Sequence, residues 1–332
     1  MYLIRNNFHS LFLASFYPNN IANEYLMKNL KHLITSLLTL IFIIGTPLLL
    51  HAFSIPTAEK VEQNIEINSV QNISNGTHFF KGTWEAALKK AKAEKKLIFV
   101  DLYFTGCAPC IQMDSLVFPQ KAIATELNNN FVSFKSDIFK EEIGKKLSMK
   151  YAVVGFPTFL FLTPEGYVLD ITSGFHEIDE LLAILSTVKK NASEKKHKKF
   201  SPSLNLDYPK FYRTAYMEGK RKIPFEIVDV YLKQQKYLGN EIPYVIILGL
   251  SVGGDYSKYI LENAKQLAKN YSRSQVKNAL IKIVERSAKS LAKKGDDISY
   301  GILLEKIKPI FTEKEWLHYH KIFQNNYTKL KV

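Results

Sequence analysis

The two cysteines of the chain, Cys107 and Cys110, lie three positions apart and directly follow a strongly apolar run. That run, residues 97–104 (LIFVDLYF), consists of β-forming residues and is typical of a buried central strand. The residues after Cys110 are predicted to be helical to about residue 128. A cysteine pair between a buried strand and a helix allows three uses: a structural disulfide, part of a metal site, or a redox centre.

Composition and spacing weigh against the first two uses. Two cysteines in 332 residues cannot form a disulfide framework, and a disulfide across two intervening residues restrains little of the unfolded chain. A structural zinc site needs four ligands, and there is no further cysteine. His318 and His320, two positions apart on a predicted helix, point in nearly opposite directions. We therefore predict no metal site and no organic cofactor.

The redox interpretation explains where the pair is placed as well as how it is spaced. Cys107 would open the helix, where unpaired backbone N–H groups and the helix dipole stabilise a thiolate. Cys110, one turn further along, would be shielded and able to attack a disulfide formed by Cys107. Pro109 stiffens the first helical turn without removing a needed hydrogen-bond donor. The pattern thus favours thiol–disulfide chemistry.

The stretch VDLYFTGCAPC, followed further along the chain by VVGFPT, resembles the thioredoxin superfamily over residues 76–190. The resemblance implies that Cys107 is the attacking thiol and Cys110 the resolving thiol. It also implies that Asp101 is the buried carboxylate that exchanges a proton with the resolving thiol. Pro157 matches the family's cis-proline, and Phe156 before it would offer its backbone to an extended substrate chain.

The sequence departs from the thioredoxin pattern around the cysteines. Thr105 and Gly106 stand where thioredoxins carry a tryptophan, so part of the usual substrate surface is missing. The motif contains Ala-Pro, without a histidine to stabilise the reduced thiolate, which favours a reducing over an oxidising role. Thioredoxins have a lysine near the buried carboxylate, but we interpret Lys135 as a solvated residue at a strand end.

The predicted elements around the cysteines form an α/β thioredoxin fold, with a central mixed sheet flanked by helices. After a short strand near residues 77–80 they are a helix at 84–96 capped by Thr83, strand 97–104, the helix to about 128, strand 131–136, helix 140–150, strands 158–162 and 167–172, and helix 177–190. Apolar residues at helical spacing then predict an all-α domain of six or seven helices. The predicted organisation is an N-terminal segment 1–54, linker 55–75, thioredoxin-like domain 76–190, basic linker 191–206 and helical domain 207–332.

An apolar, uncharged run at residues 33–50 follows Lys28 and Lys31. This is the pattern of a secretory signal peptide or an uncleaved membrane anchor, and both would place the rest of the chain outside the cytoplasm. Met27 is the natural start of such a signal, so translation is predicted to begin there. We expect an exported protein, periplasmic or anchored on the extracytoplasmic side of a membrane.

The positive charge is concentrated in the C-terminal part of the chain. Residues 1–190 carry 18 Lys and Arg against 17 Asp and Glu, whereas residues 191–332 carry 27 against 14. A basic domain attracts an acidic protein, a membrane surface or nucleic acid, although spread lysines are also typical of solvated helices. Export disfavours nucleic acid.

Two functions from different classes fit this sequence. The first is an exported thiol–disulfide oxidoreductase that acts on disulfide- or thiol-containing proteins and exchanges electrons with a membrane or periplasmic redox partner. The second is a binding or scaffold protein whose thioredoxin fold and helical domain recognise a partner. The intact pair of Cys107 and Cys110, with Asp101 and Pro157, favours the oxidoreductase.

Overall fold

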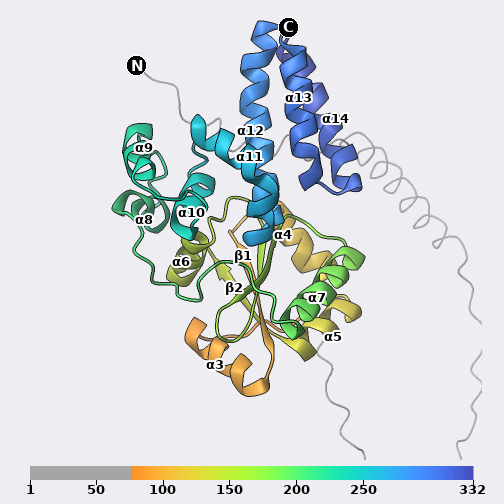
Figure 1. The fold of residues 1–332 in the computed structure, drawn as a ribbon. Coiled ribbons are helices and arrows are strands. Elements are labelled where there is room, and N and C mark those ends of the chain that lie inside the picture. Colours follow the sequence, from red (N-terminus) through yellow and green to blue (C-terminus); the bar gives the residue numbers. More distant parts are fainter. Residues whose placement is uncertain (1–75, 332) are drawn as a thin grey trace, which may run out of the picture. The chain divides into compact units, whose positions relative to one another are not determined.

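A four-stranded mixed sheet lies at the centre of residues 76–190 in the computed structural model, which describes residues 76–331 (Figure 1). The strands are β1 (Leu97–Tyr103), β2 (Phe131–Asp137), β3 (Thr158–Leu162) and β4 (Val168–Ser173), in the order β2-β1-β3-β4. β1 runs parallel to β2, and β3 runs antiparallel to β1 and β4. The predicted thioredoxin fold is confirmed, with the cysteines directly after a central strand.

Helices cover both faces of this sheet. Alternation along β1 directs Ile98, Val100 and Leu102 to the core shared with α3 (Trp84–Glu94) and α6 (Glu142–Lys150). Phe99 points to the opposite core, shared with α5 (Lys121–Asn130) and α7 (Ile178–Ser193). Because β1 is buried on both sides, all of its residues except Asp101 are apolar or aromatic. Thr83 caps α3, and its side chain accepts a hydrogen bond from Ala86 N at 3.2 Å.

Two predicted elements differ in the structure. The helix after the cysteines is broken into α4 (Ala108–Gln112), a π-helical turn η1 (Met113–Val117) and α5. Pro119 has no N–H with which to continue the helix, so a new one starts at Lys121. The strand expected near residues 77–80 is only an isolated bridge between Phe79 and Ser133.

The C-terminal region is helical, as predicted. Among the described residues it contains α8 (Lys210–Met217), α9 (Phe225–Lys233), α10 (Glu241–Gly249), α11 (Asp255–Asn270), α12 (Arg273–Lys294), α13 (Asp297–Ile307), η2 (Lys308–Ile310) and α14 (Glu313–Leu330). Ser272 caps α12 by accepting a hydrogen bond from Gln275 N, and Gly295 ends it in a left-handed conformation. Within residues 76–331 no helix is long and apolar enough to cross a membrane. The run predicted as signal or anchor, residues 33–50, and the predicted start at Met27 lie outside the described residues.

The helical region shares a hydrophobic core with the thioredoxin-like region. Phe200, within the segment predicted to be a linker, is buried with its ring 5.2 Å from that of Tyr151 and 5.0 Å from that of Tyr271. Ser272 Oγ donates to the carbonyl of Ile171 on β4 at 2.9 Å. The start of α12 is therefore fixed against the edge strand of the sheet.

Candidate active site

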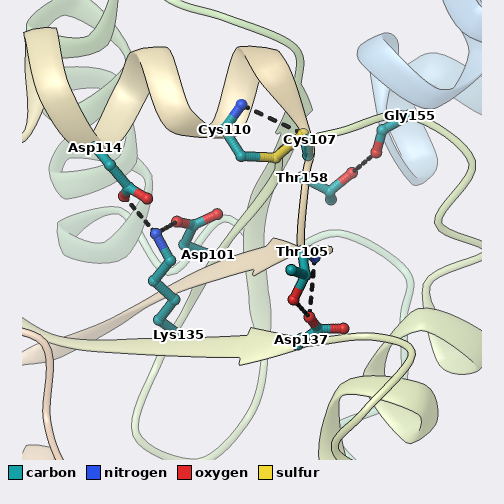
Figure 2. The surroundings of a disulfide bond; sticks show 9 residues. All are labelled: Asp101, Thr105, Cys107, Cys110, Asp114, Lys135, Asp137, Gly155 and Thr158. Atoms are coloured by element: carbon teal, nitrogen blue, oxygen red, sulfur yellow. Dashed lines mark hydrogen bonds and ion pairs between the residues drawn. A yellow bond between two sulfur atoms is a disulfide. The ribbon is translucent and has the colours of Figure 1, made fainter.

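Cys107 and Cys110 form a disulfide with an S–S distance of 2.07 Å at the start of α4 (Figure 2). β1 ends at Tyr103, and a short turn brings Cys107 to the N-cap position of α4. Its sulfur accepts a hydrogen bond from Cys110 N at 3.3 Å. Pro109 lies in the first turn of the helix, where its missing N–H costs nothing. Both cysteines are buried. The same N–H group would stabilise a thiolate at Cys107 when the pair is reduced.

Asp101 is a buried carboxyl on β1, six residues before Cys107. Burial raises its pKa to about 6, although the nearby Lys135 ammonium opposes this shift. Lys135 Nζ lies 3.1 Å from Asp101 Oδ2 as an ion pair. Within residues 76–331 neither carboxylate oxygen accepts a hydrogen bond of good geometry. A carboxyl in this state exchanges a proton near neutral pH.

Lys135 is not the solvated residue that the sequence predicted. It is only 19% exposed, and it lies between the carboxylates of Asp101 and Asp114 (Figure 2). The parallel register of β1 and β2 places it directly opposite Asp101. Burial alone would lower the pKa of Lys135, but the two carboxylates outweigh burial and raise it. The sequence alone did not point to Asp114, because its contact with Lys135 depends on how η1 packs over the sheet.

Asp137, at the end of β2, holds the loop that precedes Cys107. Its carboxylate accepts hydrogen bonds from Thr105 N at 3.0 Å and Thr105 Oγ at 2.7 Å, and from Phe139 N at 2.9 Å. Burial alone would raise the pKa of Asp137, but these hydrogen bonds outweigh it and lower the pKa. Sequence reasoning missed this residue, although an aspartate directly after a strand is a common turn signal.

The loop before β3 brings Phe156 and Pro157 to the same site. The Phe156–Pro157 peptide bond is cis, and Gly174 N donates to the carbonyl of Pro157 at 2.9 Å. Within residues 76–331, the backbone N–H of Phe156 finds no acceptor and its C=O finds no donor.

Three phenylalanines form an aromatic cluster in the loops around the Cys-Ala-Pro-Cys motif. The rings of Phe104 and Phe156 pack edge to face at 5.0 Å, and Phe104 lies 5.8 Å from Phe139. The carbonyl of Phe104 accepts a hydrogen bond from Cys107 N at 3.1 Å, which ties the cluster to the motif. Phe139 is 58% exposed. An apolar surface next to the cysteines is thus retained, built from three separate loops.

Comparison with known proteins agrees with this fold and site. A family model described as a thioredoxin-like domain matches residues 84–189. Thioredoxin H1 of Arabidopsis thaliana is 32% identical over 104 residues, which are 31% of this chain and 83% of the plant protein. Thioredoxin-1 of Drosophila melanogaster is 40% identical over 70 residues, 21% of this chain and 60% of the fly protein.

The chain is also similar, over a longer stretch, to a bacterial protein. The thiol:disulfide interchange protein DsbD of Colwellia psychrerythraea is 24% identical over 138 residues, 41% of this chain and 22% of DsbD. The chain thus spans about a fifth of DsbD and less than two thirds of the fly thioredoxin. The family model ends at residue 189 and does not include the C-terminal helices. On the match to most of a plant thioredoxin, and on the strand order around the Cys-Ala-Pro-Cys motif, the chain belongs to the thioredoxin superfamily.

Proposed function

We propose that the chain catalyses thiol–disulfide exchange with polypeptide substrates, using Cys107 and Cys110. The observation that carries the proposal is the Cys107–Cys110 disulfide at the start of a helix, in a fold that also buries Asp101 and pairs it with Lys135. This disulfide is the oxidised form of the pair. A dithiol in the same position would attack a substrate disulfide.

The reaction transfers two electrons from the dithiol to the substrate. The Cys107 thiolate attacks one sulfur of the substrate disulfide, and the other sulfur leaves as a thiolate that takes a proton from water. Cys110 then loses its proton to the Asp101 carboxylate and attacks the Cys107 sulfur. The Cys107–Cys110 disulfide forms, and the second substrate sulfur leaves as a thiolate. A pKa of about 6 lets Asp101 accept this proton near neutral pH.

The loop around Pro157 would hold the substrate. The backbone groups of Phe156, which have no hydrogen-bond partner within residues 76–331, can hydrogen-bond to an extended segment beside the cysteines. The cluster of Phe104, Phe139 and Phe156 would contact an apolar side chain of that segment.

The proposal also includes the direction of the reaction and the compartment in which it takes place. The motif without histidine favours reduction, and the apolar run at residues 33–50 favours action outside the cytoplasm. The DsbD relative carries a thiol:disulfide interchange name, which is consistent with electron supply from a membrane or periplasmic redox partner.

Trapping of the mixed disulfide tests the chemistry. A Cys110→Ser variant should accumulate a covalent complex with a disulfide-bonded fluorescent peptide, because no resolving thiol remains. A Cys107→Ser variant should trap none. Equal trapping by both variants, or by neither, would show that Cys107 is not the attacking thiol.

Equilibration with glutathione tests the direction separately. A reductase requires a Cys107–Cys110 reduction potential below that of the glutathione couple. A higher potential would assign the protein to oxidation and leave the exchange chemistry intact.

A further inference from the structure

Helix α12 of the C-terminal region borders the loop that carries Phe156 and Pro157. Asn278 Nδ2 donates to Ser173 Oγ at 2.9 Å, and Ser173 Oγ lies 2.9 Å from Ser274 Oγ. A Cβ atom at Gly155 would lie only 3.1 Å from Asn278 Nδ2. Figure 2 shows Gly155 beside a pale blue helix of this region. A polypeptide bound at the candidate active site would therefore lie close to α12.

Two cations follow Asn278 on the same face of α12. Lys282 is one turn further on and Arg286 two turns, about 6 and 12 Å along the helix axis. Lys282 Nζ donates to Ser251 Oγ at 3.2 Å, and Arg286 Nη1 donates to the carbonyl of Ser251 at 2.7 Å. Both side chains are thus held in place by the turn between α10 and α11.

A third cation, Arg221, adds to this group. It lies 4.0 Å above the ring of Tyr216, in the segment between α8 and α9. Burial lowers the pKa of Lys282, and repulsion from Arg286 and Arg221 lowers it further, while Glu285 partly opposes them. Throughout residues 76–331 no carboxylate lies within 4.0 Å of these three cations. Glu285 offsets part of the charge of Lys282 and Arg286, but it is one carboxylate against three cations, so the cluster keeps a net positive charge.

We propose that Arg221, Lys282 and Arg286 bind acidic side chains of the polypeptide whose disulfide is reduced at Cys107, so that α12 selects substrates with an acidic segment beside the disulfide. This inference rests on the proposed function. Guanidinium groups bind carboxylates through paired hydrogen bonds, and a cluster of unpaired cations attracts anions. The net positive charge of residues 191–332, 27 basic against 14 acidic side chains, acts in the same direction.

Matched peptides test the selection in the full chain. Three fluorescent peptides with one disulfide would be compared, flanked by four Glu, four Gln or four Lys residues, with dithiothreitol as the electron source. For the wild-type protein, kcat/KM should be about tenfold higher for the Glu peptide than for the Gln peptide at low salt, and lowest for the Lys peptide. The preference should shrink as salt rises.

A charge-matched pair of variants locates the effect on α12. The Lys282→Gln/Arg286→Gln variant should lose most of the Glu-over-Gln preference. The Lys289→Gln/Lys293→Gln variant removes the same charge from exposed positions of the same helix and should keep it. A preference that persists in the first variant would overturn the assignment.

The wild-type measurements alone can refute the inference, so a refutation does not depend on how well a variant folds. Reduction of the Glu and Gln peptides at equal kcat/KM would refute the acidic-substrate inference and leave the exchange activity standing. Reduction of none of the peptides would refute the proposed function itself. Equal inhibition of Glu- and Gln-peptide reduction by millimolar inorganic phosphate, without any peptide preference, would reassign the cluster to small anions.

Discussion

The protein contains two comparable lysine–carboxylate pairs. One lies at the disulfide and the other where the helical region meets the sheet region, and they differ in which partner has its pKa shifted against its charged form. At the disulfide, the Asp101 carboxylate is the poorly satisfied partner, and its pKa is raised to about 6. At the junction, Lys150 is fully buried and its Nζ lies 2.6 Å from Glu241 Oε1, while Glu241 Oε2 also accepts from Ser201 N at 2.7 Å. There burial lowers the pKa of the lysine instead.

The difference shows what each pair is suited to do. A carboxyl that lacks hydrogen bonds changes protonation near neutral pH and can take part in chemistry. The Glu241 carboxylate, which accepts hydrogen bonds from a backbone N–H and from a buried ammonium, is suited to hold two regions together. Breaking each pair should therefore have effects of a different kind and even of opposite sign.

The largest expected effect is kinetic. Asp101→Asn should slow the attack of Cys110 on the mixed disulfide by about a hundredfold to ten-thousandfold, because Cys110 loses its base. Rapid-mixing measurement of substrate release from the preformed mixed disulfide checks this. Asp170→Asn is the control, since burial also raises the pKa of that carboxyl on β4. Equal slowing in both variants would show that Asp101 has no specific role.

At the junction the corresponding change should act on stability. Glu241→Gln leaves the Lys150 ammonium buried without a carboxylate, so the free energy of unfolding should fall by about 3 kcal/mol. Urea denaturation measures this loss, with Glu226→Gln on the surface of α9 as control. A loss as small as that of a surface ion pair, below about 1 kcal/mol, would contradict the assigned role of the pair.

At the disulfide the acid-to-amide change should stabilise the protein. The folded-state pKa of Asp101, about 6, lies above its ordinary value of 3.8. The stability that this shift contributes is complete below about pH 4 and is lost as the pH rises through 6. At pH 7 the Asp101→Asn protein should be about 2 kcal/mol more stable than the wild type. Urea denaturation of the oxidised proteins at several pH values checks this, and parallel pH profiles would refute it.

The smallest expected effect is a shift in pH dependence. Lys135→Met removes the ammonium that favours ionised Asp101, so the pH midpoint of the Cys110 step should rise by about one unit. Asp114→Asn should lower the midpoint by a smaller amount, because Lys135 would then form an ion pair with Asp101 alone. A common direction in the two variants would show that Lys135 does not mediate between the carboxylates.

Local patterns were enough to predict β1, the cysteine motif at the start of a helix, and helix α3 with its cap. The apolar run of β1, the Thr83 cap and the turn with Pro109 are features of neighbouring residues. Lys135 was misread because its partner depends on the register between two strands. Asp137 and Asp114 also act through contacts between residues far apart in sequence. Such contacts depend on tertiary packing, which periodicity and propensity do not encode.

The helical region illustrates the same limit. Its apolar stripes predicted a helical region, but no local signal placed α12 beside Gly155. That contact joins residues more than a hundred positions apart, as does the hydrogen bond between Ser173 and Asn278. For the same reason, a basic segment rich in lysine looked like a linker although Phe200 within it is buried.

The shared core around Phe200 determines how this protein can be cut and recombined. A fragment ending near residue 190 would expose the ring of Tyr151 and leave Lys150 without Glu241. Such a fragment is expected to aggregate rather than report on the isolated redox activity. The thioredoxin-like part is thus not expected to fold well on its own, and a chimaera that borrows it should keep the C-terminal helices through α14, because α13 and α14 pack against α12.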